Sequence, residues 1–166
     1  MKFTRPLFAA VVLAIAGGLS LTTVSQAGEK PMKGRFINLK SELNCTKVED
    51  VEGHVICTFE LPSVGILGDG EYYSRIVKGT IDYVKGVGKN QGYTISTVAD
   101  GSTVTDEWEG SSKFNDQKVM ILEGTYSCTT GTGRYSNIKC KGTWRSSVQK
   151  GGFSLGEYEG TMTLPD

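Results

Sequence analysis

Two charged residues stand in rows of the sequence that otherwise alternate like buried strands. Arg75 falls in register with Tyr73 and Val77, and Asp106 lies two residues before Trp108. Because an unpaired buried charge is costly, each must pair, reach water or contact a ligand. Polar groups within an aromatic cavity fix the orientation of a bound molecule, so we interpret Arg75 and Asp106 as candidate ligand-binding residues. Two alternatives are a structural Arg–Asp pair and a bulge that turns either side chain outward.

Aromatic side chains supply the rest of the candidate ligand site. They recur on the apolar side of the alternating segments, where they would surround a small, mostly apolar molecule. The candidates are Tyr73, Tyr83, Trp108, Tyr126 and Trp144, with Tyr93 and Tyr158 expected in the same inward rows. The competing expectation is that side chains alone fill the interior, as they can in an eight-stranded barrel.

The motifs that could indicate catalysis lack the neighbouring elements and residues that catalysis requires. The segment from Gly152 to Gly156 matches G-x-S-x-G, but no helix is expected after Ser154 and the only histidine, His54, precedes it. Gly131-Thr-Gly133 lacks the spacing of a phosphate-binding loop. His54 lies opposite an apolar row with no evident orienting partner, which favours a solvated strand histidine over a general base. We therefore expect no catalytic residue and no cofactor.

A basic stripe runs along one late segment. Lys139, Lys141 and Arg145 share one strand face. The stripe could bind an anionic partner, but Glu157 and Glu159 on the next strand offer opposite charges across the sheet. A solvated outer face is therefore the favoured interpretation.

The N-terminus has the pattern of a secretory signal peptide. Lys2 and Arg5 precede an apolar run over 7–21, and Ser25-Gln26-Ala27 places small residues at a cleavage site. The run is shorter than the ~20 residues of a membrane-spanning helix, and it lacks the polar positions of an amphipathic core helix. We predict cleavage after Ala27, a mature domain over 28–166 without a membrane span, and a periplasmic or secreted location.

An oxidising compartment makes the four cysteines interpretable as disulfides. Four cysteines allow three connectivities, and the two neighbouring pairs have equal spacing, which favours Cys45–Cys57 and Cys128–Cys140. Each bridge would contribute about 3 kcal/mol by the loop-entropy relation. A zinc site is the alternative, but with no C-x2-C pair and one histidine it would need all four thiolates at unusual spacing, so we expect no metal.

Composition and periodicity predict a single all-β domain. The chain has 166 residues, and its 18 basic and 18 acidic side chains argue against a nucleic-acid binder, which would be strongly basic. Asp100-Gly101-Ser102 between alternating segments predicts a hairpin. About eight such segments indicate a sandwich or an eight-stranded antiparallel up-and-down barrel of the calycin type. Inward glycines at 79, 124, 142 and 160 fit the small closed barrel.

The segment from Gly124 to Trp144 (GTYSCTTGTGRYSNIKCKGTW) carries a family resemblance. It resembles the G-x-Y…G-T-G-x-[FY] segment of allene oxide cyclase-like and dirigent-like barrels, which small exported bacterial proteins of unassigned role share. The closing 158–165 and the middle 99–110 resemble the same group. The resemblance implies the barrel fold. Its motif residues are turn and packing residues, so no active-site residue is carried over.

The chain departs from that group at Cys128 and Cys140, which flank the GTGRY turn. The departure implies a disulfide that staples this hairpin. The first functional hypothesis is an exported barrel that binds a small, mostly apolar ligand. A protein-binding barrel, such as an inhibitor, is the alternative, followed by a cyclase- or isomerase-like enzyme. Nothing in the sequence indicates an oligomeric state.

Overall fold

Strands and tight turns make up nearly the whole of the described chain. The computed structural model describes residues 28–40 and 42–164, so the predicted signal peptide over 1–27 lies outside the described residues. The elements are β1 (Lys30–Asn38), β2 (Leu43–Lys47), β3 (His54–Leu67), β4 (Tyr72–Val84), β5 (Val87–Val98), β6 (Thr103–Phe114), β7 (Met120–Gly131), the 3-10 turn η1 (Gly133–Tyr135), β8 (Lys139–Val148) and β9 (Ser154–Thr163).

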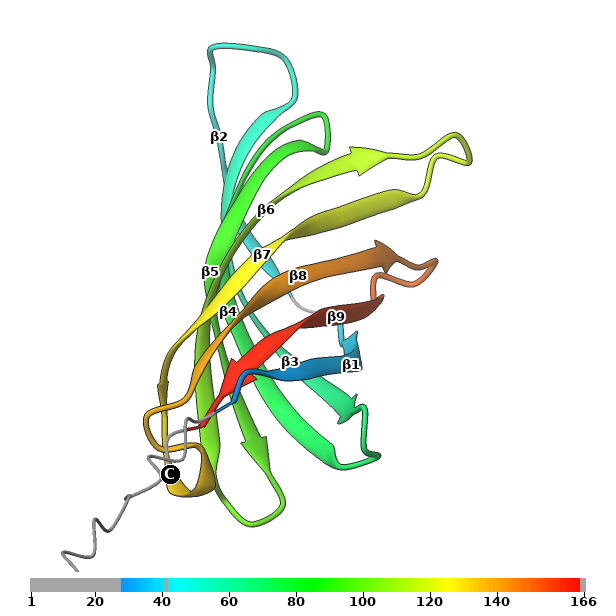
Figure 1. Cartoon of the computed structure of the whole chain (residues 1–166). Coiled ribbons are helices and arrows are strands. Elements are labelled where there is room, and N and C mark those ends of the chain that lie inside the picture. The colour runs from blue at the N-terminus through cyan, green and yellow to red at the C-terminus, as the bar shows by residue number, and fades with distance from the viewer. Residues whose placement is uncertain (1–27, 41, 165–166) are drawn as a thin grey trace, which may run out of the picture.

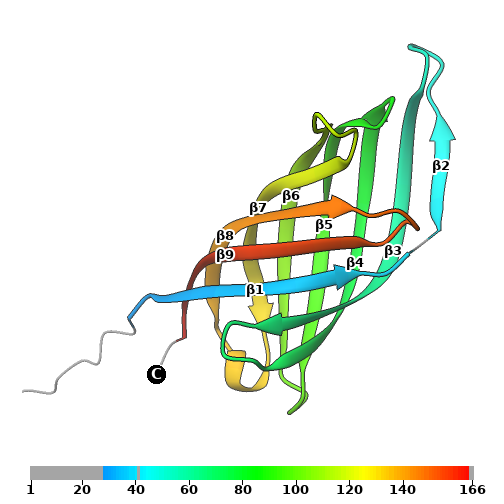
Figure 2. The same cartoon turned by 90° about the vertical axis from the view of Figure 1, so that its right-hand side faces the viewer.

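The sheet closes on itself. From β3 to β9 each strand pairs antiparallel with the next, and β1 pairs with β9 on one side and β3 on the other. This confirms the predicted eight-stranded up-and-down barrel (Figures 1 and 2). The Asp-Gly hairpin between β5 and β6 is also confirmed.

A ninth strand, β2, was not predicted. Its residues pair with the first part of β3, whereas β1 pairs with the last part of the same strand. The β2–β3 hairpin projects beyond the rim of the barrel (Figures 1 and 2). We call this the upper end; the β4–β5, β6–β7 and β8–β9 hairpins belong to it, and the β3–β4, β5–β6 and β7–β8 connections form the lower end.

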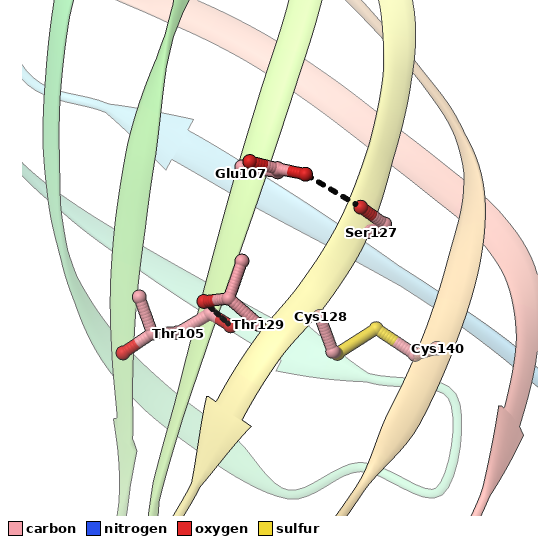
Figure 3. Close-up of a disulfide and its surroundings, with 6 residues drawn as sticks. All are labelled: Thr105, Glu107, Ser127, Cys128, Thr129 and Cys140. Atoms are coloured by element: carbon pink, nitrogen blue, oxygen red, sulfur yellow. Dashed lines mark hydrogen bonds between the residues drawn. A yellow bond between two sulfur atoms is a disulfide. The ribbon is translucent and has the colours of Figure 1, made fainter.

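Both predicted disulfides are confirmed. Cys45 lies directly opposite Cys57 and is bonded to it, which fastens β2 to β3. Cys128 is bonded to Cys140, which joins β7 to β8 (Figure 3). All four cysteines are consumed, and the described residues contain no cluster suited to a metal ion.

A β-bulge interrupts β7 beside Asp106. Thr105 pairs with Thr130 and Asp106 with Cys128, so Thr129 is the extra residue, and its hydroxyl donates to the Thr105 carbonyl over 3.1 Å (Figure 3). Asp106 still lines the lumen. The bulge therefore does not turn this carboxylate outward, which was one of the alternatives.

Arg134 of the GTGRY turn ties the lower end together. Its guanidinium pairs with Glu71, lies 3.6 Å from Asp100 and stacks on the Tyr135 ring at 5.0 Å. Its backbone N–H donates to Ser102 Oγ over 3.1 Å. These contacts link the β3–β4, β5–β6 and β7–β8 connections.

Within the described ranges no helix is long and apolar enough to span a membrane.

Candidate functional site

The interior of the barrel is a cavity rather than a filled core. It has a volume of about 1160 Å³ and is lined by inward-facing residues of all eight barrel strands. The structure brings most of the predicted site residues together on its wall: Tyr73, Arg75, Tyr83, Asp106, Trp108, Tyr126, Trp144 and Tyr158. The expectation that side chains alone fill the barrel is therefore wrong.

Tyr93 is the exception among the predicted aromatic residues. Its side chain is 54% exposed on the outer face, because the inward row of β5 is the alternate one that contains Gly92 and Thr94. Thr94 is fully buried. The prediction for Tyr93 was wrong because it took the apolar row of β5 as the inward one, whereas Tyr93 and Ile95 both lie on the solvent side.

Glycines on the inner wall explain how a small barrel stays hollow. A Cβ atom at Gly79 would lie 2.8 Å from the Trp108 ring, and one at Gly110 would lie 2.7 Å from the Trp144 ring. Each indole thus lies along the inner wall, across the adjacent strand and against the backbone of the strand beyond it, instead of crossing the lumen. The same arrangement places the Tyr73 ring over Gly65. The missing side chains make room for flat aromatic rings.

Gly65→Ala is expected to lower the free energy of unfolding by about 1–3 kcal/mol, because its Cβ would overlap the Tyr73 ring and force it inward. Gly68→Ala is the matched control, since the three atoms nearest its Cβ all belong to Lys33, and the first of them is the flexible side-chain Cγ at 3.0 Å. Urea unfolding of both variants measures the difference. Equal stability of the two would contradict the packing of the ring on glycine.

Arg75 is a half-buried cation whose guanidinium is incompletely hydrogen-bonded. Its guanidinium stacks on the Phe36 ring at 4.6 Å, and Nη2 donates to Thr94 Oγ1 over 3.4 Å. Its Nε and Nη1 atoms are buried and have no hydrogen-bond partner among the described residues. Such groups in a native protein call for water or a ligand.

Asp106 lies near Arg75 without forming an ion pair. It is directly opposite Thr94 in the β5–β6 ladder, and within the described chain no Arg75–Asp106 contact falls within 4.0 Å. Burial raises the pKa of Asp106 to about 6, and the nearby Arg75 charge offsets this only in part. A direct structural pair, the other alternative for these residues, is therefore not formed.

Further polar atoms face the lumen without partners in the described chain. They are the hydroxyls of Tyr73 and Tyr126, Nε1 of Trp108 and the amide oxygens of Asn38 and Asn90. Burial raises the pKa values of Tyr73, Tyr126 and Tyr158, so these phenols stay neutral and can donate hydrogen bonds.

Sequence reasoning missed several lumen residues. Phe36 supplies the ring beneath Arg75, and Thr94 bonds to it. Asn90 donates to the Tyr83 hydroxyl over 2.9 Å. A period-two row started at Asn90 instead of Tyr93 would have found Asn90 and Thr94, but its small polar residues carry no apolar signal.

His54 has the orienting partners that the sequence did not reveal. Its Nδ1 lies 2.6 Å from Asp50 and its Nε2 lies 2.8 Å from Asp82. These hydrogen bonds, to Asp50 first and then to Asp82, raise the pKa of His54. With both ring nitrogens engaged by carboxylates, the imidazole tethers the β2–β3 connection to β4 and has no free nitrogen to act as a base.

The remaining sequence motifs are parts of the wall. Arg145 lies on the outer face opposite Glu123 on one side and Glu157 on the other, as the cross-strand interpretation predicted for Glu157. Ser154 of the G-x-S-x-G segment begins β9 and accepts a hydrogen bond from Asn38 over 3.1 Å. It begins a strand and precedes no helix, so it is not a nucleophile elbow.

Comparison with known proteins finds similarity only among solved structures. No protein-family model matches the sequence, and no curated protein matches it. Two similar solved structures are those of the pterocarpan synthase dirigent proteins PsPTS1 and GePTS1. The first is 11% identical, with 84% of this chain and 97% of that chain covered and a TM-score of 0.49. The second is 12% identical, with 93% and 100% covered and a TM-score of 0.47. The barrel assignment itself follows from the strand pairing of this chain.

Proposed function

We propose that this protein is an exported β-barrel that binds a small, mostly apolar molecule with one polar end inside its lumen. The observation that carries the proposal is the lumen itself: about 1160 Å³, walled by aromatic rings, with unpartnered polar groups of Arg75, Tyr73 and Trp108 inside. Apolar pockets with a few convergent polar groups are typical of small-molecule sites.

Export is part of the same proposal. Two disulfides are typical of proteins that mature in an oxidising compartment, which agrees with the signal-peptide pattern of the first 27 residues. The ligand would then be a molecule that the protein meets in the periplasm or outside the cell.

Titration with N-phenyl-1-naphthylamine, a neutral apolar fluorophore, tests lumen binding. The only two tryptophans, Trp108 and Trp144, both line the cavity, so a bound probe should quench their emission by energy transfer. We expect Val77→Trp, which adds an indole to the lumen wall, to weaken binding at least about tenfold when the probe is excited directly.

Ile76→Trp is the matched control, because Ile76 directly precedes Val77 in β4 and is 38% exposed on the outer face. It should bind the probe as the unmodified protein does. Equal weakening by the two variants, or no binding to the unmodified protein, would contradict a ligand site in the lumen. The second result would favour the protein-binding alternative.

A further inference from the structure

Most of the unsatisfied polar atoms of the lumen are hydrogen-bond donors; the exceptions are the amide oxygens of Asn38 and Asn90, which lie toward the upper end on β1 and β5. Arg75 Nε and Nη1 and Trp108 Nε1 can only donate, and the neutral hydroxyls of Tyr73 and Tyr126 are able to donate. All of these atoms are buried and lack a partner in the described chain. Their complement is a group that only accepts and can take several hydrogen bonds at once.

The charge of Arg75 points to the same complement. Its guanidinium is enclosed between the Phe36 ring and Thr94, and no carboxylate lies within ion-pair distance in the described residues. Buried guanidinium N–H groups without a close counter-charge are costly, and a charge-assisted bond to an anion would offset that cost. A carboxylate meets both requirements, because it is charged and accepts at two oxygens.

The aromatic rings around the polar cluster indicate what the rest of the ligand is like. Trp108 contacts Phe59 at 6.2 Å and Trp144 at 5.9 Å between ring centroids, which forms a continuous aromatic wall above the polar cluster. Tyr126 and Tyr158 form a second edge-to-face pair at 5.9 Å. A flat apolar body would lie against these rings while its polar end reaches Arg75.

We propose that the lumen ligand is an apolar or aromatic carboxylic acid whose carboxylate is bound by Arg75, with Tyr73, Tyr126 and Trp108 as further donors. The inference rests on the proposed function and adds the chemical class of the ligand. Burial raises the pKa of Asp106 to about 6, so below that pH this carboxyl is protonated and compatible with a bound anion. When protonated it is one more donor.

A matched pair of probes separates this inference from lumen binding as such. 8-Anilino-1-naphthalenesulfonate has the framework of N-phenyl-1-naphthylamine with one added sulfonate, which stands in for the carboxylate. We expect the unmodified protein to bind the sulfonate at least about tenfold more tightly, with quenching of Trp108 and Trp144 by both probes. In competition, 4-phenylbutyrate should displace the probe at a concentration at least about tenfold lower than 4-phenylbutanol does.

Arg75→Leu should weaken binding of the sulfonate at least about tenfold and leave binding of the neutral probe within about twofold. Arg145→Leu, which removes the same charge from the outer face, should change neither. The circular dichroism spectrum shows whether Arg75→Leu folds as a barrel. If it does not, the double variant Arg75→Leu/Asp106→Leu replaces it, because removing both residues leaves neither charge in the lumen without the other.

Equal affinity of the unmodified protein for the two probes overturns the assignment of an anion, while lumen binding stands. A loss of both probes in folded Arg75→Leu also overturns it, because Arg75 would then only shape the cavity. Failure of both probes to quench the tryptophans removes the proposed function and this inference together.

Discussion

Replacement of Cys128 and Cys140 by serine is expected to lower the free energy of unfolding by about 3 kcal/mol. The bridge closes a short loop, so its loss restores chain entropy to the unfolded state. That loop contains η1 and Arg134, which tie together the connections at the lower end, so native contacts depend on it as well. Urea unfolding under non-reducing conditions measures the loss.

The pair Cys45→Ser and Cys57→Ser is the control, because both bridges span the same separation of 12 residues. The loop-entropy relation alone predicts equal losses. We expect a loss of only about 1 kcal/mol here, because β2 pairs along a single edge and all its residues are exposed, so it can detach while the barrel stays closed. Equal losses would show that β2 is as firmly held as the barrel strands.

Asp106→Asn is expected to raise the free energy of unfolding by about 1–3 kcal/mol at pH 7.5 and to have no stabilising effect at pH 4. In the folded state burial raises the pKa of Asp106 to about 6, despite the opposing Arg75 charge. The native state therefore binds the proton more tightly than the unfolded chain. The stability this contributes is fully present below the ordinary pKa of an aspartate and is lost as the pH rises through about 6.

Asparagine keeps the neutral form at every pH, so the variant should lack that loss. Thermal or urea unfolding from pH 4 to pH 8 measures both profiles. Glu107→Gln is the control: it removes a carboxylate from the next residue of β6, on the exposed outer face, and should change stability by less than about 0.5 kcal/mol. An Asp106→Asn protein less stable than the unmodified one at pH 7.5 would mean that the attraction to Arg75 outweighs the cost of burial.

Period two and turn chemistry were enough to predict the barrel. In β4 the row from Tyr73 to Tyr83 faces inward as predicted, because its apolar residues point to the lumen and its polar residues to solvent. In β5 the arrangement is the opposite, with small and polar residues inside. Gly92 must be small to admit the Trp108 ring, and Thr94 bonds to Arg75, so the apolar side chains of that strand lie outside.

The candidate site was predictable in its charged members and not in their surroundings. Arg75 and Asp106 stood out because a charge within an apolar row is anomalous. Phe36 is far from Arg75 in sequence and reaches it only because β1 closes the barrel against β3. The partners of His54 have the same origin: Asp50 precedes it in a turn, but Asp82 arrives through the pairing of β3 with β4.

The closure of the sheet by its first strand has a kinetic consequence. Every pairing from β3 to β9 joins neighbours in the sequence, and these hairpins can form locally. The pairing of β1 with β9 joins residues 30–38 to 154–162, so it must wait for almost the whole chain. Until then β1 and β9 each present an open edge, which is the state in which β-proteins aggregate. We therefore expect the final step of folding to be a slow ring closure, which is also the step that first creates the lumen.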